Sequence, residues 1–358
     1  MALTGARVLV VGAGIIGRST AYFLARQGAK VVLLDEGIPA GSPTSRASLG
    51  VLTHCNGGDN PYAQLFRDGH ALHARLARDL AEDVGADVGW RPLGGIDLFA
   101  DPAQLEEVWR FNRERGCRVE RLDERALRDA EPALDGGGEG LYFADDHRVD
   151  PLKLGAALWA AAGRQGASAA WGERVWRIAQ AGETVEVATN SETHRADFAV
   201  LAAGAWTGGL AAQLGARVAL RPVRGQQARF AGAPLRHLVR INGRHFIPDG
   251  GEMIVGATSE EVGFRLETTP AAAAQFASEV RSALGKYLPL SRQQVGLRPK
   301  PRGGRPLIGP LTDAPRVFVA SGHYKNGVLL GPITGQIVAR WIVEGTPGRD
   351  MRRFAPER

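Results

Sequence analysis

The chain has 358 residues, of which 44% are hydrophobic and 23% are charged, a composition typical of a globular protein with two lobes. The net charge of +6 does not indicate nucleic-acid binding, because the basic residues are scattered and only five of the 44 are lysines. No apolar run reaches about 18 residues without charges or clustered glycines, which excludes an obvious transmembrane helix. Cys55 and Cys117 are too few for a disulfide framework, so a reducing cytoplasm is the expected location.

A glycine-rich turn near the start is the most informative motif. It contains Gly12, Gly14 and Gly17. It lies between an expected strand at residues 8–11 and an expected helix from residue 15 to about residue 28. Glycines at this spacing allow a tight turn, a close approach of the backbone to a diphosphate, and close packing of helix on strand. The helix N-terminus then presents free N–H groups to the phosphates.

An acidic pair follows at the distance that such a turn requires. Residues 31–34 form the second expected strand, which ends at Asp35 and Glu36. A carboxylate at this point accepts a hydrogen bond from a ribose hydroxyl. The turn and the acidic pair together predict that the chain binds a dinucleotide. Residues 36–50, rich in glycine, proline and hydroxyl groups, are expected to form a loop that wraps the ligand.

The remaining elements alternate between helices and strands. Helical periodicity predicts helices at residues 62–84, 102–115, 152–165, 270–288 and 328–343. Strands are expected at residues 90–100, 174–178, 184–189, 218–230, 239–247, 252–256 and 316–320. Residues 197–206 form a buried strand followed by a small-residue turn and a helix. This strand either returns to the dinucleotide-binding sheet or is an ordinary core strand, and the first interpretation is favoured.

The order of these elements predicts an α/β protein with two interleaved domains. Residues 1–85, 140–217 and 295–358 are assigned to a discontinuous, Rossmann-like dinucleotide-binding domain. Residues 86–139 and 218–294 are assigned to a substrate domain. A single antiparallel sheet from these two insertions is expected to cover the cleft above the dinucleotide.

Four segments carry a resemblance to a known family. They are VVGAGIIG at residues 10–17, RPVRGQ at 221–226, GLRP and RPLIG at 296–299 and 305–309, and GHYKNGVLLGP at 322–332. With these motifs the chain resembles the D-amino-acid-oxidase-like FAD-dependent oxidoreductases, and among them the glycine oxidases of thiamine biosynthesis. The resemblance implies the glutathione-reductase type of fold, in which an FAD-binding domain interleaves with an antiparallel-sheet substrate domain.

The resemblance also implies which residues hold the cofactor. FAD is expected to be noncovalent, because the cysteine that covalent relatives carry near the C-terminus is missing. The ADP half is assigned to Gly12, Gly14, Ile15, Ile16, Gly17, Asp35, Glu36 and Val175. Gly204 is also assigned to the cofactor site. The flavin side is assigned to Thr44, Ser45, Leu49, Gly50 and Val51. The pyrimidine edge of the ring is assigned to His323, Tyr324, Asn326, Gly327, Val328 and Leu329.

Three residues are candidates for the catalytic site. Arg298 matches the family's substrate-carboxylate arginine, and a planar guanidinium suits two-pronged binding of a carboxylate. Lys325 replaces a second arginine typical of glycine oxidases, and His245 replaces an aromatic hydroxyl. Lys325 is either a second cation of the site or an exposed amine. His245 is either a pocket residue or a strand histidine bonded to the backbone.

The expected reaction is oxidative deamination of glycine or a small D- or N-methyl amino acid. It yields an imino acid, then a keto acid and ammonia, and molecular oxygen becomes hydrogen peroxide. If a base is needed, the candidates are His54 and His323. The alternatives are an FAD-dependent D-amino acid dehydrogenase that reduces a quinone or carrier, and a nicotinamide enzyme or nucleotide-binding regulator. The expected partners are thus a small amino acid and an electron acceptor, and a homo-oligomer is allowed.

Overall fold

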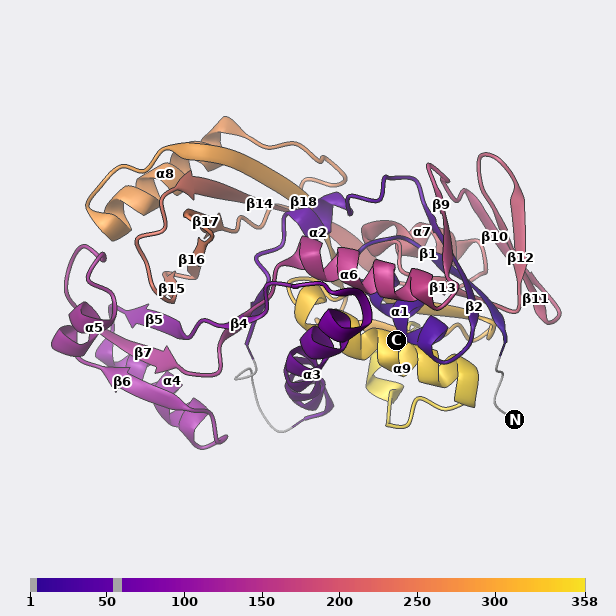
Figure 1. Cartoon of the computed structure of the whole chain (residues 1–358), viewed down its shortest axis with the longest axis horizontal. Coiled ribbons are helices and arrows are strands. Elements are labelled where there is room, and N and C mark those ends of the chain that lie inside the picture. The colour runs from indigo at the N-terminus through magenta and orange to yellow at the C-terminus, as the bar shows by residue number, and fades with distance from the viewer. Residues whose placement is uncertain (1–4, 54–59, 358) are drawn as a thin grey trace.

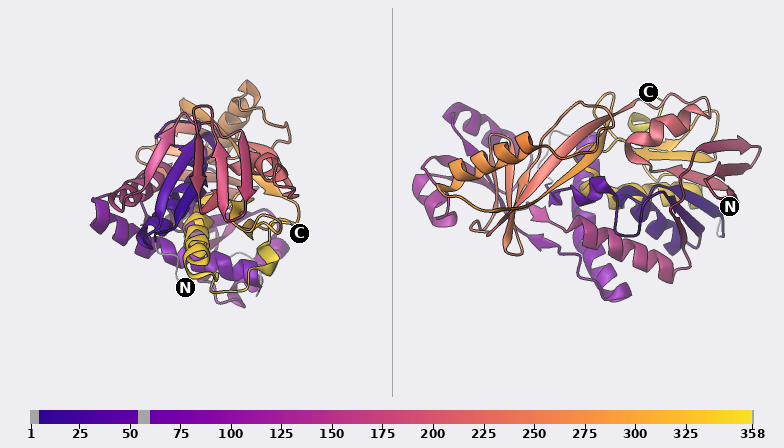
Figure 2. Two further views of the ribbon diagram at one scale, coloured as in Figure 1. Left: turned by 90° about the vertical axis from the view of Figure 1, so that its right-hand side faces the viewer. Right: turned by 90° about the horizontal axis from the view of Figure 1, so that it is seen from above.

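The computed structural model describes residues 5–53 and 60–357. The chain forms two halves that lie side by side, one built on a six-stranded sheet and the other on an eight-stranded sheet (Figure 1). The view from above shows the same two halves along the long axis of the molecule (Figure 2). Among the described residues, no helix has the length and apolar character needed to cross a membrane.

The six-stranded sheet contains the predicted dinucleotide-binding strands. Its order is β19 (Leu307–Pro310), β20 (Val317–Ser321), β13 (Phe198–Leu201), β1 (Arg7–Val11), β2 (Lys30–Asp35) and β9 (Ser168–Trp171). All neighbours are parallel except β19 and β20. Because β13 pairs directly with β1, the interpretation of residues 197–206 as a returning strand is confirmed. Parallel strands of this kind are apolar on both faces because helices or further strands cover both.

Each face of this sheet packs against different elements. One face packs against four helices, α1 (Ile15–Arg26), α3 (Pro61–Val84), α6 (Pro151–Arg164) and α9 (Gly327–Glu344). The other face packs against α7 (Thr207–Ala212) and a small sheet of β10 (Arg177–Ala181), β11 (Thr184–Ala188) and β12 (Thr193–Ala196). The short helix η1 (Gly204–Trp206) connects β13 to α7.

Glycines allow α9 to lie directly on α1. A Cβ atom at Gly335 would lie 2.6 Å from the carbonyl carbon of Ser19, and one at Gly331 would lie 3.4 Å from its hydroxyl. Larger residues at these two positions would therefore push the helices apart. This contact places the N-terminal turn of α9 beside Ile15, the first residue of α1.

The eight-stranded sheet joins both insertions, as expected. Its order is β18 (Leu290–Pro301), β14 (Leu220–Ala231), β17 (Glu252–Gly256), β16 (Arg244–Asp249), β15 (Leu238–Ile241), β5 (Gly95–Phe99), β7 (Glu139–Phe143) and β6 (Val119–Leu122). The expectation of a purely antiparallel sheet is wrong at one place, because β15 and β5 pair in parallel. That junction joins strands from two separate insertions, so no hairpin constrains their direction.

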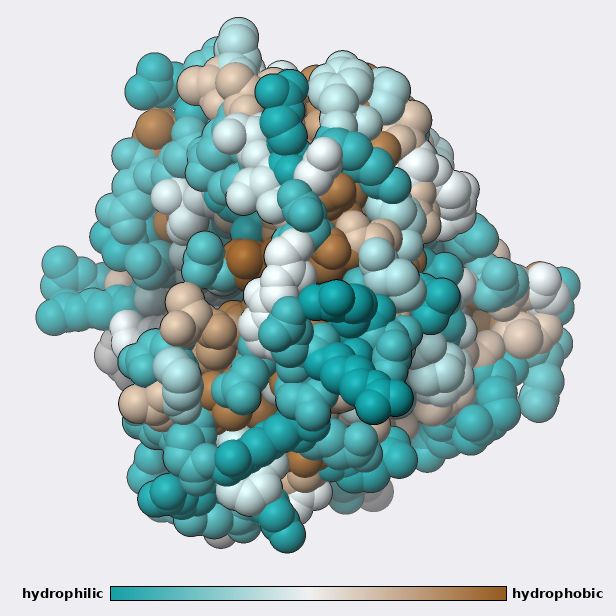
Figure 3. Space-filling model, turned by 90° about the vertical axis from the view of Figure 1, so that its left-hand side faces the viewer, coloured by the Kyte–Doolittle hydropathy of each residue, from teal (hydrophilic) through white to brown (hydrophobic). Residues whose placement is uncertain are grey.

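Three helices cover the eight-stranded sheet. They are α8 (Pro270–Leu284) on one face, and α4 (Pro102–Arg113) and α5 (Glu124–Ala130) at the end formed by β6 and β7. Seen from this end of the molecule, the surface is mainly hydrophilic, with hydrophobic residues scattered among polar ones (Figure 3). Such scattered apolar residues are usual on a solvent-facing surface.

Several predicted elements differ in detail from the structure. Residues 239–247 form the hairpin of β15 and β16 rather than one strand, because Asn242 and Gly243 adopt φ values of +50° and +74°. An Asn-Gly pair favours a tight hairpin turn of this kind. Residues 90–100 divide into β4 (Arg91–Pro92) and β5, and the strand expected at residues 174–178 begins at Arg177.

The loop expected at residues 36–50 contains one helical turn, α2 (Pro43–Arg46). The side chain of Ser42 accepts a hydrogen bond from the backbone N–H of Ser45, at 3.3 Å, and Pro43 occupies the first helical position. Both features favour a helix start. After the loop, β3 (Val51–Leu52) pairs with β8 (His147–Arg148), which also pairs with β4.

The sheets also revise the proposed domain boundaries. Residues 140–143 belong to β7 and residues 295–301 to β18, so both segments lie in the eight-stranded sheet. The sequence division had assigned them to the dinucleotide-binding domain. We therefore propose that this domain resumes at about residue 144 and again at about residue 302. The sequence pattern does not predict strand β18, because its polar residues do not alternate regularly with apolar ones.

Candidate active site

The glycine turn has the close contacts that its spacing predicts. A Cβ atom at Gly12, where φ is +106°, would lie 2.6 Å from the carbonyl oxygen of Ala202. One at Gly17 would lie 1.8 Å from the carbonyl oxygen of Gly12. Gly14 is open by comparison, since its nearest neighbour would be the hydroxyl of Ser42 at 3.5 Å. Two glycines therefore shape the turn, and the third leaves room for a ligand.

Asp35 and Glu36 have different surroundings. The carboxylate of Asp35 accepts hydrogen bonds from the backbone N–H of Ala13, at 2.5 Å, and of Gly37, at 2.7 Å. The side chain of Glu36 is exposed and lies 3.8 Å from Arg174. Of the two carboxylates, Asp35 is thus the one that touches the glycine turn.

Two further residues assigned to the cofactor lie near this end of the sheet. Val175 lies in the loop after β9, which is tied to Asp35 by a hydrogen bond from the N–H of Glu173 to the Asp35 carbonyl oxygen, at 3.0 Å. Gly204 begins η1 directly after β13, with φ at +55°. Its carbonyl oxygen accepts a hydrogen bond from the hydroxyl of Ser321, at 3.0 Å.

A buried arginine beside the turn was missed by the sequence reasoning. Arg18 is 4% exposed and donates to the carbonyl oxygens of Ala13, Pro39 and Gly155, at 2.8, 2.7 and 3.3 Å. Burial lowers the pKa of Arg18, and the nearby Asp35 only partly offsets this effect. Arg18 lines a cavity of about 290 Å³ together with Ile15 and residues of the turn. The available signal was a charged residue on the buried face of α1, next to a phosphate-binding motif.

The residues assigned to the flavin side connect the two halves. The hydroxyl of Thr44 donates to the carbonyl oxygen of Leu297 at 3.0 Å and accepts from its N–H at 3.2 Å. The hydroxyl of Ser45 accepts from the N–H of Ile15, at 3.2 Å, and so satisfies one of the free donors of α1. This segment therefore touches both the dinucleotide turn and strand β18.

Next in the chain, Leu49, Gly50 and Val51 also lie at this junction. Leu49 and Val51 pack against buried residues of the eight-stranded sheet, including Ile247 and Ile254. Gly50 has φ at +72°, and a Cβ atom there would lie 2.0 Å from the carbonyl oxygen of Val149. No larger residue fits at that position without moving the backbone.

The segment before α9 is held from several sides. His323 is buried, and its Nε2 lies 2.9 Å from the hydroxyl of Thr334. Burial lowers the pKa of His323 to about 3, so the ring is neutral near pH 7. Its Nδ1 is buried without a hydrogen-bond partner among the described residues. Tyr324 adopts φ of +52°, which is unusual for a residue with a Cβ and reorients the backbone before the helix.

The first turn of α9 completes this edge. The side chain of Asn326 donates to the hydroxyl of Tyr62 at 3.3 Å, and Gly327 lies next to Ile15. Val328 and Leu329 are buried in the core beneath the helix. The N-termini of α1 and α9 therefore meet at the same edge of the six-stranded sheet, where they favour negatively charged groups.

A second buried histidine supports α9. Pro332 lacks the N–H that would bond to the carbonyl oxygen of Val328 four residues earlier. Nε2 of His73, in α3, lies 3.1 Å from that oxygen and 3.2 Å from the carbonyl oxygen of Leu329. It donates in the neutral form, since burial lowers its pKa to about 4. His73 thus replaces a hydrogen bond that the proline removes.

Arg298 lies on the face of the eight-stranded sheet that meets the flavin-side loop. Paired residues of neighbouring strands share a face. The pairing of β18 with β14, of β14 with β17 and of β17 with β16 therefore places Arg298 on the same face as Gly256 and His245. Ile247 and Ile254, which contact the loop, lie on this face too.

The surroundings of Arg298 leave its charge unbalanced. Its Nη1 donates to the carbonyl oxygen of Thr258 at 2.9 Å, and its guanidinium covers Gly225, where a Cβ atom would lie 2.1 Å from Cζ. Within the described residues, no carboxylate lies within ion-pair distance of it. Arg298 is half-buried, and this burial lowers its pKa. A buried cation without a partner favours an incoming carboxylate.

His245 and Lys325 are close enough to influence each other. Burial, followed by the charges of Arg240, Lys325 and Arg244, lowers the pKa of His245 to about 4, so this ring is neutral near pH 7. His245 also hydrogen-bonds the backbone of Gly256, as the more conservative interpretation predicts. Lys325 is exposed, with its Nζ 5.6 Å from the ring centre of Tyr324.

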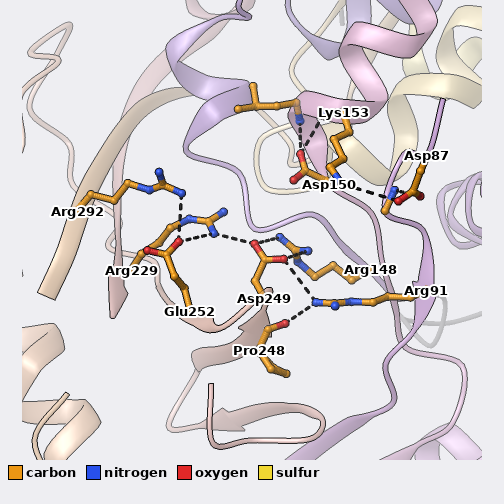
Figure 4. Close-up of polar contacts among 12 residues, drawn as sticks. Asp87, Arg91, Arg148, Asp150, Lys153, Arg229, Pro248, Asp249, Glu252 and Arg292 are labelled. Atoms are coloured by element: carbon orange, nitrogen blue, oxygen red, sulfur yellow. Dashed lines mark hydrogen bonds and ion pairs between the residues drawn. The ribbon is translucent and has the colours of Figure 1, made fainter. Parts of the chain in front are cut away.

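A network of ion pairs joins the two halves beside this site. Both guanidinium nitrogens of the buried Arg148, in β8, donate to Asp249 in β16, at 2.7 and 2.9 Å. Arg229 donates to Oδ2 of the same carboxylate, at 2.7 Å, and so shares this oxygen with Nη2 of Arg148, while Arg91 lies 3.6 Å from Oδ1. Figure 4 shows the arginines converging on Asp249 from different elements. Since β8 pairs with the flavin-side strand β3, this network fixes that strand to the large sheet.

The residues present fit FAD. The open face at Gly14, the buried cation of Arg18 and the two helix N-termini suit a diphosphate. In the segment before α9, the buried Nδ1 of His323 has no hydrogen-bond partner among the described residues, so this atom is available to the cofactor. His54, one candidate base, lies outside the described residues, and the neutral His323 is already bonded to Thr334.

Comparison with known proteins agrees with this arrangement. A model of the FAD dependent oxidoreductase family (DAO) matches residues 7–341. A glycine oxidase from Geobacillus kaustophilus is 28% identical over 97% of this chain and 96% of its own length. One from Pseudomonas aeruginosa is 30% identical over 98% of both chains.

Solved structures agree as well. The crystal structure of the Geobacillus kaustophilus glycine oxidase superposes with a TM-score of 0.93, at 28% identity, over 99% of both chains. An iminodiacetate oxidase from a Chelativorans species superposes with a TM-score of 0.90, at 25% identity, over 98% of this chain and 99% of its own. These similarities confirm the fold class and the enzyme class expected from the sequence motifs, with FAD as cofactor. The chain therefore belongs to the DAO family of FAD-dependent oxidoreductases.

Proposed function

We propose that the protein oxidises a small amino acid at its Cα–N bond, with Arg298 holding the substrate carboxylate. The glycine oxidases to which the chain is similar support glycine, and small D- or N-methyl amino acids fit the same chemistry. Bound FAD would supply the two-electron acceptor. The Cα–H bond breaks, an imine forms, and water releases a keto acid together with ammonia, or with methylamine where the substrate is an N-methyl amino acid.

The unpaired guanidinium of Arg298 carries this proposal. It bonds only to the carbonyl oxygen of Thr258 within the described residues, while other N–H groups stay available. A two-pronged contact with a carboxylate fixes both the position and the rotation of a small substrate. The guanidinium thus holds Cα in one orientation on the face of the sheet that meets the flavin-side loop.

The neighbouring groups support orientation rather than proton transfer. His245 is neutral, and its backbone hydrogen bond to Gly256 occupies one ring nitrogen. Tyr324 and Ser259 share a hydrogen bond of 3.0 Å between their hydroxyl groups. We infer that these side chains form a polar wall beside the substrate.

The test is anaerobic bleaching of the bound flavin. Glycine, D-alanine and N-methylglycine are mixed with the FAD-loaded protein, and loss of its absorbance is followed in time. Arg298→Ala is expected to lower kcat/KM by a factor that corresponds to about 2–4 kcal/mol of lost transition-state stabilisation, because a charged contact in a partly dry site is lost. Arg298→Lys should recover part of the loss. A panel of amino and N-methyl amino acids that leaves the flavin oxidised contradicts the proposal.

The electron acceptor is tested separately. We propose oxygen, which yields hydrogen peroxide, and a quinone or carrier protein is the alternative. Aerobic turnover should give one peroxide per amine oxidised. Fast reduction of a dye with little peroxide would identify a dehydrogenase instead.

A further inference from the structure

Three cations gather around the ring of Tyr324. Nζ of Lys300 and Nζ of Lys325 lie 5.5 and 5.6 Å from the ring centre. Arg298 is the third, close enough for Tyr324 to influence its pKa. Tyr324 is fixed in the middle by the bond of its hydroxyl to Ser259 and by its N–H, which donates to the carbonyl oxygen of Pro299 at 3.2 Å.

Only one of these cations has a carboxylate partner. Lys300 lies 3.5 Å from Glu261, which is also 2.9 Å from Arg221. Arg298 and Lys325 have no ion pair in the described parts of the chain. Glu261 is thus shared by two cations. Glu260 also acts on Arg298, from beyond ion-pair distance, but it is itself paired with Arg224 at 2.6 Å. Within residues 5–53 and 60–357, Arg298 and Lys325 therefore lack a carboxylate of their own.

This arrangement departs from the rest of the eight-stranded sheet. Elsewhere in this sheet, arginines that are buried or half-buried have carboxylate partners. Arg224 lies 2.6 Å from Glu260, and Arg244 lies 2.7 Å from Glu279. Arg240 is paired with two carboxylates, one of them Asp146 at 2.6 Å. Arg298 is half-buried, and a cation in such a place is stabilised when a ligand supplies the negative charge that the protein does not. Lys325 is exposed, so its missing partner costs little stability, but its charge lies beside the same place and can bind a second negative group.

Polar, uncharged groups lie near these two cations. His245 is neutral, and the hydroxyls of Ser259 and Tyr324 face each other. One substrate carboxylate balances Arg298 and leaves Lys325 without a partner. A second carboxylate at the Lys325 side balances both charges.

We propose that the preferred substrate is an amine with two carboxylates, one bound by Arg298 and the other by Lys325. This inference rests on the proposed function and narrows its substrate class. The second carboxylate sits on the side chain or on the amine substituent. Both have the same chemistry toward Lys325, and the oxidation itself is unchanged.

The experiment compares substrates that differ only in the second carboxylate. D-aspartate is paired with D-alanine, and N-carboxymethylglycine with N-methylglycine, and kcat/KM is measured for each with FAD-loaded protein. At least one dicarboxylate should exceed its partner ten-fold or more. The pair that shows the preference identifies where the second carboxylate is attached.

Variants of Lys325 test the assigned residue. Lys325→Gln should lower the ratio of dicarboxylate to monocarboxylate kcat/KM at least ten-fold, mainly through KM, and Lys325→Arg should preserve it. Lys286→Gln, which removes an exposed charge beyond the end of α8, is the control and should leave the ratio unchanged.

The outcomes separate the two proposals. If monocarboxylates bleach the flavin and neither dicarboxylate is preferred, this inference is wrong and the proposed function stands. An unchanged ratio in Lys325→Gln also overturns it, because the second carboxylate then binds elsewhere. If no amine reduces the flavin, both proposals fail.

Discussion

The two halves of the molecule treat buried charge differently. In the six-stranded half, the buried histidines His73 and His323 are neutral near pH 7, because burial lowers the pKa of each. In the eight-stranded half, most buried charges are paired, as in the contact of the buried Arg224 with Glu260. In both halves, therefore, a buried charge that has no compensating group is an exception.

The exceptions to this rule point to the ligands. Arg18 lies beside the turn that suits a diphosphate, and Arg298 lies where a substrate carboxylate is proposed. Both are buried or half-buried cations without a carboxylate within ion-pair distance in the described residues. Paired arginines therefore stabilise this fold, whereas we expect an anion to bind at Arg18 and Arg298, which have no carboxylate partner in the described residues.

The largest expected effect concerns the pairing itself. Asp249→Asn should lower the free energy of unfolding by about 3–5 kcal/mol, because it leaves the buried Arg148 without a counter-ion. Urea unfolding of the FAD-loaded protein measures the change. Asp79→Asn, which breaks a solvent-exposed pair with Arg26, is the matched control and should cost about 0–1 kcal/mol. An equal decrease in the free energy of unfolding in both variants would show that the buried network stabilises the fold no more than an exposed ion pair does.

Acid should reveal the neutral histidines. The pKa values of His73 and His245 are lowered from 6.5 to about 4, and that of His323 to about 3. As the pH falls below 6.5, the unfolded chain takes up protons before the folded one does. The stability that is fully present above pH 6.5 is therefore lost on the way down to about pH 4, by about 1.4 kcal/mol for each pKa unit.

Unfolding free energies at pH 7.5 and pH 4.5 measure this loss. His73→Gln, which keeps an N–H for the carbonyl oxygen of Val328, should lose less stability between these pH values than the wild type. The pKa of Asp249 stays below its usual value despite burial, because of Arg148 and Arg229, so that pair should fail only at lower pH. A wild-type stability that is flat between pH 7.5 and pH 4.5 would contradict the buried neutral state.

Arg18 should control cofactor affinity. Arg18→Met is expected to raise the dissociation constant of FAD about 10- to 100-fold, because a charged interaction with the diphosphate is lost. Fluorescence of released FAD measures the affinity without any substrate. Arg26→Met, on the same helix but exposed, is the control. Unchanged FAD affinity in Arg18→Met would show that this side chain only connects the carbonyl oxygens around it.

The smallest expected effect is at the joint between the halves. Thr44→Val removes both hydrogen bonds to the backbone of Leu297 and should cost about 1–2 kcal/mol. Thermal unfolding of the FAD-loaded protein measures it. Thr346→Val, which removes an exposed bond to the N–H of Gly348, should be nearly neutral. If both variants melt alike, the two halves do not depend on this joint.

Local sequence is enough to predict the dinucleotide-binding start of the fold. Gly12, Gly14 and Gly17 encode the turn through their lack of side chains, and local periodicity encodes the strands and helices around it. The returning strand β13 was also predictable, because its continuous apolar run suits only a buried position. These features depend on residues close together in the chain.

The tertiary structure alone decided how distant residues combine. The parallel junction of β5 with β15 and the placement of Arg298 over Gly225 follow from pairings between segments far apart in sequence. The same holds for Lys325, which lies near His245 only because the segment before α9 comes close to β16. Spacing along a chain carries no information on such contacts, since packing of the whole core fixes them.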